Sequence, residues 1–310
     1  MHYISRKNTY ALVILVIFGV LLSGCAQSRE KTDPSEQEDH TIAAEQVQQP
    51  KEGIQTLLVS CVEPFDVSRD SGSYRNGNKA DLIMLMVTDE EAGKTTVLQL
   101  NPDTMVSFSV PGTSETVQIP LGLSFSYGSG GSDSCLNQSK AVSNLLEGIP
   151  VDHYMVFTMD SIAVVNDMLG GVTVATEEDF QAEYPGLPEG ENLVLMGETA
   201  IEFFRYRSEE DVANEAHMER QRRYMAGLYR PFMENAQNED FLARLTIQLG
   251  DGLSTDLTLS QMVQMLALLD SYKLDETILT LQGDASKAAG EFQYRVDKDS
   301  LDKMLESLFY

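Results

Sequence analysis

The chain of 310 residues carries 48 Asp and Glu against 22 Lys and Arg, which gives a formal net charge of −26 at pH 7. This acidity argues against nucleic acid as a partner, because nucleic-acid recognition depends on basic surface patches. Hydrophobic residues make up 42% of the sequence, so the chain can form one sizeable domain or two small ones.

The amino terminus has the pattern of a secretory signal. Two basic residues, Arg6 and Lys7, precede an apolar run at 10–22 that is shorter than the roughly 20 residues needed to cross a bilayer. The sequence LSGC, which ends at Cys25, resembles the lipobox of bacterial lipoproteins and implies that Cys25 is lipidated. We therefore expect residues 1–24 to be a signal peptide and the protein to be anchored at the outer face of the cytoplasmic membrane. The alternative is an uncleaved anchor with the same topology.

A composition change separates a tether from a folded domain. Residues 25–52 are polar and rich in Glu and Gln, and such a composition cannot bury a core. We expect a disordered acidic tether there and a folded domain at 53–310. The two cysteines of that domain, Cys61 and Cys135, allow two interpretations. They form a disulfide, which export permits, or they are two separate small core residues.

The folded part alternates strand and helix signals. Continuous apolar runs at 53–62 and 81–87 are typical of strands that are buried on both faces. Further strands are expected at 95–101, 154–159, 171–176 and 277–282. Helices are expected at 137–147, 161–169, 198–204, 216–234, 259–272 and 300–309. This alternation predicts an α/β protein, a three-layer α/β/α sandwich around a mixed central sheet.

Two carboxylates flank the hairpin that the second and third expected strands form. If these strands pair about the turn-rich segment 89–93, Asp81 lies opposite Asp103 at the open end. Neighbouring like charges are unfavourable unless a proton or a cation lies between them. Oxygen ligands favour Mg²⁺ or Mn²⁺, with phosphate oxygens completing the shell. The alternative is structural: one carboxylate caps a turn and the other is solvated.

Basic residues are concentrated between positions 205 and 230. Six of the 22 fall there and all six are Arg, which suits bidentate contacts to phosphate or carboxylate oxygens. In the expected helix at 216–234, Gln221 lies on the apolar stripe and Arg220 at its edge, at the border of the buried face. Arg205 and Arg207 share a face only if that segment is extended, so we expect a helix to end at about Phe204. We interpret the other three arginines as solvated residues that pair with Glu side chains on the same helix. They are Arg222, Arg223 and Arg230.

Several segments, taken in their order, resemble the LytR-CpsA-Psr family. They are ADLIMLMV at 80–87, Asp103-Thr104, the stretch 143–174, GETAIEFFRYR at 197–207, MERQRRYMAGLY at 218–229 and the stretch 254–273. The resemblance is strongest over 53–283. It implies an extracytoplasmic enzyme of mainly Gram-positive bacteria, which transfers a glycopolymer from a polyprenyl-pyrophosphate carrier to peptidoglycan. It also implies an α/β/α fold with an apolar pocket for the lipid tail.

The resemblance assigns roles to particular residues. Asp81 and Asp103 become the catalytic and metal-binding carboxylates, with Mg²⁺ or Mn²⁺ as the cofactor. The pyrophosphate is held by four residues in or before the expected helix at 216–234: Arg205, Arg207, Arg220 and Gln221. Three positions depart from the family pattern: Pro102 stands where the family has Arg, Asn214 where it has Asp, and His217 where it has Arg.

These departures leave three interpretations. The first is a working phosphotransferase with a substituted site, and the second is a degenerate relative that binds polyprenyl phosphates or wall polymer without turnover. The third is an extracellular solute-binding lipoprotein, which is disfavoured because the sequence has no Trp and no two repeated α/β halves. For a protein with these substitutions we expect ligand binding to survive while transfer is slow.

Overall fold

The central sheet is mixed, as the sequence predicts. In a computed structural model that describes residues 50–64, 74–175, 192–271, 273–274, 278–288 and 290–310, seven strands form the sheet, in the order β10-β3-β2-β1-β6-β9 with β11 also on β3. The pairs β1–β2, β2–β3 and β6–β9 are antiparallel, whereas β1–β6, β10–β3 and β11–β3 are parallel. The strands are β1 (Ile54–Pro64), β2 (Asn78–Asp89), β3 (Lys94–Leu100), β6 (His153–Thr158), β9 (Leu253–Thr255), β10 (Lys273–Leu274) and β11 (Leu279–Thr280).

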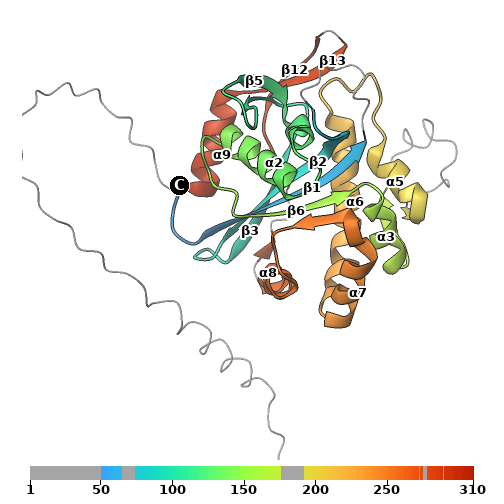
Figure 1. Cartoon of the computed structure of the whole chain (residues 1–310). Helices are drawn as coiled ribbons and strands as arrows, with labels where there is room; N and C mark the ends of the chain where they lie inside the picture. The colour runs from blue at the N-terminus through green and yellow to red at the C-terminus, as the bar shows by residue number, and fades with distance from the viewer. Residues whose placement is uncertain (1–49, 65–73, 176–191, 272, 275–277, 289) are drawn as a thin grey trace, which may run out of the picture. The chain divides into compact units, whose positions relative to one another are not determined.

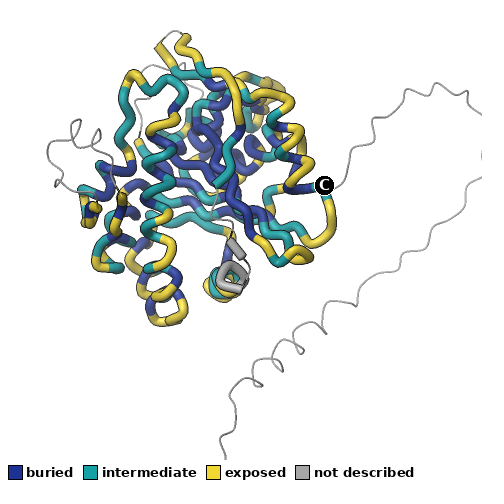
Figure 2. The backbone as a smooth tube through the Cα atoms, turned by 180° about the vertical axis from the view of Figure 1, so that it is seen from behind, coloured by how far each residue is buried: buried dark blue, intermediate teal, exposed yellow. Residues whose placement is uncertain are grey.

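Helices cover both faces of this sheet, which confirms the three-layer sandwich (Figure 1). One face packs against α2 (Ser132–Leu145), α9 (Lys298–Phe309) and the 3₁₀ segment η3 (Leu121–Tyr127). The other face packs against α3 (Ser161–Met168), α5 (Gly197–Arg205) and α6 (Glu215–Ala236). The buried part of the tube in Figure 2 follows the central strands between these two helix layers.

The sequence of strand β2 is a continuous apolar run because both faces of the strand are buried. Ile83 and Leu85 pack into the core on the α2 side, whereas Leu82 and Met84 pack into the core on the α6 side. Successive side chains of a strand point to opposite faces, so a strand that is covered on both faces must be apolar throughout.

A β-bulge interrupts the pairing of β1 with β2. Cys61 lies opposite Leu82 and Val62 lies opposite Ala80, so Asp81 is an extra residue without a partner on β1. A bulge re-aims a side chain by breaking the strict alternation of faces. As a result, Asp81 and Leu82, although adjacent in sequence, both point towards α6: Asp81 contacts α6 directly, and Leu82 belongs to the α6-side core.

The remaining elements are short hairpins and peripheral helices. The hairpins are β4 (Met105–Ser109) with β5 (Thr116–Pro120), β7 (Val172–Ala175) with β8 (Asn192–Leu195), and β12 (Gly283–Ala288) with β13 (Glu291–Val296). Helices α7 (Glu239–Leu249) and α8 (Leu259–Ser271) complete the α6 side together with the short 3₁₀ segment η4 (Gly250–Gly252). Sequence reasoning missed the helix α7 and the strands β4, β5, β8, β9, β10, β12 and β13. It placed one strand at 277–282, where the described residues form only the short β11.

The two cysteines of the folded domain do not form a disulfide. Within the described residues both thiols are free and buried. Cys61 belongs to the core on the α6 side and Cys135 to the core on the α2 side, so the sheet separates them. The core-residue interpretation is confirmed and the disulfide interpretation is wrong.

The region before residue 50, including Cys25, lies outside the described residues. All the elements described above belong to one compact unit, Gln48–Tyr310. Among the described helices, none combines the length and the apolar character that a membrane span requires.

We predict that Gly227→Ala destabilises the protein, although alanine favours a helix interior over glycine by about 1 kcal/mol. A Cβ at position 227 of α6 would lie 2.2 Å from the carbonyl oxygen of Thr173 on β7. Relief of such a clash typically costs about 1–3 kcal/mol and outweighs the gain in helix propensity. Urea denaturation of the two proteins measures the difference. A higher midpoint for the variant would show that α6 and β7 are not packed this closely.

Candidate functional site

Four elements change from apolar to polar at the same end of the α6-side core. On each element, an apolar residue of that core has a polar or charged residue within three positions of it, on the side of this end. The pairs are Cys61 and Glu63 on β1, Leu82 and Asp81 on β2, Phe204 and Arg205 on α5, and Tyr224 and Gln221 on α6. The structure therefore places a long apolar region next to a polar cluster.

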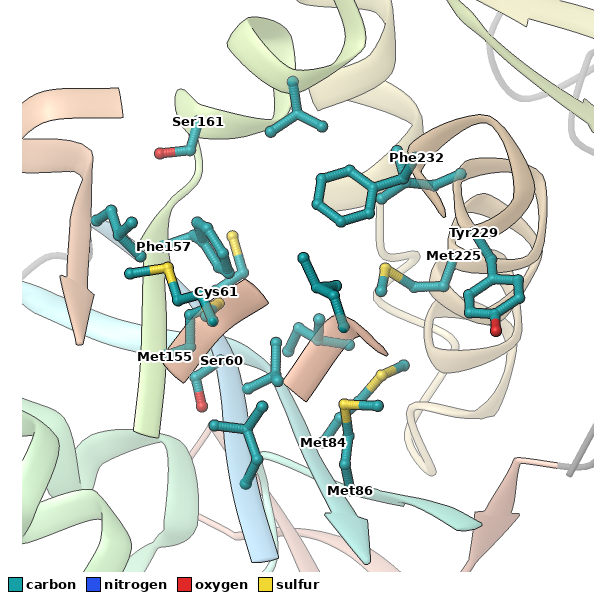
Figure 3. A pocket seen from close by; sticks show the side chains of 18 of the residues that line it. Ser60, Cys61, Met84, Met86, Met155, Phe157, Ser161, Met225, Tyr229 and Phe232 are labelled. Carbon is teal, nitrogen blue, oxygen red and sulfur yellow. The ribbon is translucent and has the colours of Figure 1, made fainter. Parts of the chain in front are cut away.

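The apolar region is hollow. A cavity of about 710 Å³ lies between the sheet and helices α3, α6, α7 and α8 (Figure 3). Its wall is rich in methionine: Met84, Met86 and Met155 come from the sheet, and Met225 from α6. Unbranched, polarisable methionine side chains adapt to irregular apolar ligands. The cavity confirms the expected apolar pocket.

Asp81, His217 and Gln221 form the buried centre of the polar cluster. The Gln221 amide Nε2 donates to Asp81 Oδ2 at 3.0 Å, and His217 Nε2 lies 3.1 Å from the same oxygen. Gln221 Nε2 is also 2.8 Å from His217 Nε2. Only 1% of His217 and of Gln221 is exposed, which confirms that Gln221 points inward and has the partners that a buried amide requires. Within the described part of the chain, His217 Nδ1 is buried without a hydrogen-bond partner.

Asp103 and Arg207 form the second part of the cluster. Arg207 Nη1 lies 2.7 Å from Asp103 Oδ2, and about a fifth of each side chain is exposed. The separation is that of a close ion pair, although its geometry is not that of a hydrogen bond. Arg207 also donates to the carbonyl of Asp211 through Nε and Nη2, at 3.3 and 3.1 Å. Its Cζ lies 4.1 Å from the ring centroid of Phe292 on β13, in a cation–π arrangement.

The other arginines are distributed between the cluster and the surface. α5 ends at Arg205 and Tyr206 is extended, as the sequence predicts within one residue. Arg205 is exposed, and its positive charge acts on Glu63. Arg220 Nη1 donates to the carbonyl of Tyr206 at 3.1 Å, and its guanidinium lies over the Tyr206 ring.

The three remaining arginines form the intrahelical pairs that the sequence suggests. Arg222 and Arg223 both contact Glu219, and Arg230 contacts Glu234. Arg222 also donates to Gln99 Oε1 at 2.7 Å, so it is more than a solvated surface residue.

Sequence reasoning missed three polar residues around the cluster: Gln99 and Asn101 at the end of β3, and Asp211 between α5 and α6. Gln99 Nε2 donates to Gln221 Oε1 at 3.1 Å and so fixes the orientation of that amide. Asn101 Oδ1 accepts from the backbone N–H of Asp103 at 3.0 Å. Asp211 Oδ2 accepts from the backbone N–H of His217 at 2.9 Å. Gln99 and Asn101 stand at the end of an otherwise apolar run, and buried amides require defined hydrogen-bond partners. This pattern is the sequence signal that predicts a polar site at the end of β3.

The two aspartates are not cross-strand partners. The β2–β3 hairpin has Ile83 opposite Leu100, one residue away from the expected register, and the described pairing ends there. Asp81 Oδ2 contacts α6, while Asp103 contacts Arg207. Within the described ranges no group of three or more His, Cys, Asp or Glu side chains is arranged to hold a metal ion. Two carboxylates suit Mg²⁺ only when substrate phosphates supply further oxygen ligands.

Comparison with known proteins supports the same architecture. A model described as the LytR_cpsA_psr family matches residues 18–309. The polyisoprenyl-teichoic acid–peptidoglycan teichoic acid transferase TagU of Bacillus subtilis (strain 168) is 23% identical over 306 residues, which cover 98% of this chain and 96% of that protein.

Solved structures share the fold at low identity. A structure described as TagT bound to LI-WTA has a TM-score of 0.63 and 18% identity, and the match covers 83% of this chain and 90% of that chain. The crystal structure of Bacillus subtilis TagV has a TM-score of 0.61 and 17% identity, over 83% of this chain and 96% of that chain.

We predict that Glu63→Gln stabilises the protein at pH 7. Burial raises the pKa of Glu63, and the nearby Asp81 raises it further, while Lys79, Arg205 and His217 lower it. Because the folded state holds this proton more tightly than the unfolded state, the free energy of unfolding falls as pH rises from the unfolded pKa through the folded one. Glutamine does not ionise, so the free energy of unfolding of the variant does not fall in this way as pH rises.

The measurement is the urea midpoint of both proteins between pH 4 and pH 8. The advantage of the variant should grow as pH rises and disappear in acid. Two results would contradict the claim that the folded state disfavours ionised Glu63. One is a difference in urea midpoint that stays constant between pH 4 and pH 8, and the other is a variant that is less stable at pH 7.

Proposed function

The chain belongs to the LytR-CpsA-Psr family, and on that premise we propose that it transfers a glycopolymer from a polyprenyl-pyrophosphate carrier to the peptidoglycan of the cell wall. The observation that carries the proposal is the apolar cavity, whose wall residues Leu82 and Tyr224 are close neighbours of Asp81 on β2 and of Gln221 on α6. A ligand with a long apolar tail and a charged headgroup fits such an arrangement. The Bacillus subtilis relative is named as a transferase of teichoic acid from a polyisoprenyl carrier to peptidoglycan.

The cavity accounts for binding of the carrier tail. Its wall is almost entirely apolar, with Phe157, Leu228 and Phe232 beside the methionines. Burial of hydrocarbon contributes about 0.8 kcal/mol per CH₂ group, so several isoprene units supply strong binding. The methionines allow a bent, branched chain to be accommodated without a single fixed shape.

The polar cluster accounts for binding of the pyrophosphate. Arg205, Arg207 and Arg220 supply positive charge. Gln221, which Gln99 holds in place, supplies an amide donor once it releases its contact with Asp81 or His217. Guanidinium groups bind phosphate oxygens in bidentate fashion and remain charged at any physiological pH. Binding requires Arg207 to share or exchange its contact with Asp103.

The proposed reaction is a displacement at phosphorus. A hydroxyl oxygen of the acceptor glycan forms a bond to the phosphorus that carries the glycopolymer, and the bridging P–O bond breaks. The bridging oxygen leaves with the electron pair as polyprenyl monophosphate. The hydroxyl proton passes to a carboxylate, Asp81 or Asp103. The arginines stabilise the charge that develops on the departing phosphate.

A divalent cation completes the proposal. Asp81 and Asp103 would hold Mg²⁺ or Mn²⁺ together with phosphate oxygens of the substrate. When bound, the ion would neutralise negative charge on the pyrophosphate.

The substituted positions keep a second candidate function open, that of a relative that binds carrier lipid without turnover. His217 lies against Asp81 where the family has an arginine, and Asn214 is a buried residue at the start of α6 with φ of 63°. A neutral amide is neither a base nor a strong metal ligand. A solute-binding lipoprotein, by contrast, would be built from two repeated α/β halves. The described residues form one central sheet instead, which disfavours that alternative.

We predict that Asp81→Asn lowers transfer at least about a hundredfold and removes the gain in carrier binding that Mg²⁺ provides. The assay follows labelled wall polymer from polyprenyl pyrophosphate to peptidoglycan, and carrier binding is measured with and without Mg²⁺. The matched control is Asp89→Asn, at the opposite end of the same strand, which should behave like the unaltered protein.

The outcomes separate the alternatives. Equal transfer by Asp81→Asn and the unaltered protein would contradict the catalytic assignment. Carrier binding without any transfer by the unaltered protein would establish the binding-only relative instead.

We further propose that a lipid on Cys25 anchors the protein to the outer face of the cytoplasmic membrane, where its carrier lipid resides. The basis is the short apolar run and the LSGC sequence. Cys25→Ala should release the protein from the membrane fraction or block its processing. Unchanged membrane retention, together with an unchanged mass of the mature protein, would contradict lipidation at this position.

A further inference from the structure

A second cavity, which we call the polar cavity, lies beside the first half of α6. Its volume is about 570 Å³. Its wall comes from four segments: residues 99–104 at and after the end of β3, residues 211–219 with Arg222, residues 280–283, and Tyr294 on β13. Among the described residues it shares no wall residue with the apolar cavity, which lies along the second half of α6.

The polar cavity borders the proposed pyrophosphate site. Three of its wall residues also contact that site: Gln99 donates to Gln221, Asn101 accepts from the N–H of Asp103, and the Asp211 carbonyl accepts from Arg207. A ligand in the polar cavity is therefore separated from the pyrophosphate site by single side chains. A second substrate has to bind this near to the site, and its reacting hydroxyl has to pass these side chains to come within about 3–3.5 Å of the phosphorus.

The charge of the wall excludes a phosphate ligand. Asp211, Glu215 and Glu219 line the cavity together with a single basic residue, Arg222. The Arg222 guanidinium is already engaged by Glu219 and by Gln99. Burial raises the pKa of Tyr294, and the negative charge of Glu215 raises it further, which is consistent with Glu215 lying near this side chain. An anionic ligand would be repelled here, so the cavity does not extend the pyrophosphate site.

The size and chemistry of the wall also exclude a bound ion. No metal-binding group of three or more side chains is present in the described ranges, and the volume far exceeds that of a cation. The wall instead combines the side chains of Thr104, Thr280 and Gln282 with the aromatic ring of Tyr294. Hydroxyl and amide groups exchange hydrogen bonds with sugar hydroxyls, and an aromatic ring provides an apolar surface for the C–H face of a sugar.

We propose that the polar cavity binds the acceptor: an uncharged, N-acetylated sugar of the peptidoglycan glycan strand, placed with a hydroxyl towards the pyrophosphate. The inference rests on the proposed transferase function and adds the position of its second substrate. The donor lipid enters from the apolar cavity and the acceptor from the opposite half of α6. The two sites then adjoin each other at Arg207, with the buried pair Gln99 and Gln221 between them.

The test is a substitution that fills the polar cavity. Ala216 lies in the first turn of α6, is exposed and lines the cavity, so Ala216→Trp places an indole in the space without disturbing the core. The control is Ala92→Trp, an equally exposed alanine in the turn between β2 and β3. The probes are chitotetraose, an uncharged oligomer of N-acetylglucosamine, and polyprenyl pyrophosphate with and without an attached N-acetylglucosamine.

We expect Ala216→Trp to weaken chitotetraose binding at least tenfold, to leave both polyprenyl pyrophosphates bound as before, and to lower transfer at subsaturating acceptor. Ala92→Trp should change none of these. Unchanged chitotetraose binding in Ala216→Trp, or failure of the unaltered protein to bind chitotetraose, would overturn the inference. Selective weakening of the sugar-bearing donor would assign the cavity to the donor and also overturn it. If the unaltered protein binds neither polyprenyl pyrophosphate, the proposed function itself fails.

Discussion

The structure depends on one boundary between apolar and polar side chains. Strands β1 and β2 and helices α5 and α6 all cross from the hydrophobic core to charged or amide residues at the same end of that core. Unpaired polar groups in an apolar interior are costly, so the stability of this boundary depends on the contacts that its buried polar side chains make with one another. Asp81 Oδ2, His217 Nε2 and Gln221 Nε2 contact one another between the sheet and the helix, and His217 Nδ1 is the exception without a partner among the described residues.

The bulge at Asp81 makes this boundary possible. In a regular strand, Asp81 would point away from Leu82 into the hydrophobic core on the α2 side. The additional residue turns Asp81 towards α6, where the amide of Gln221 donates to it. Gln99 then holds Gln221 and is itself held by Arg222. This chain of side chains links the proposed donor site to the polar cavity on the other side of Gln99.

Much of this fold follows from local patterns in the sequence, but the site does so only in part. The buried strands and the amphipathic α6 are strong local signals, and the inward position of Gln221 follows from its place on the apolar stripe. The bulge at Asp81 has no such signal, because it arises from the pairing of β1 with β2. The register of the β2–β3 hairpin depends on its turn, and a difference of one residue removes the pairing expected of Asp81 with Asp103. Contacts made by residues distant in the sequence, such as Arg207 with Phe292, are set by tertiary packing.

The central claim is that one ligand occupies the apolar cavity with its tail and the polar cluster with its pyrophosphate. Calorimetric titration with geranyl, farnesyl and geranylgeranyl pyrophosphate tests it most directly. Each added isoprene unit should tighten binding at least about tenfold, with an increasingly negative heat-capacity change, until the cavity is filled. Affinities that do not depend on chain length, or that match inorganic pyrophosphate, would contradict the claim.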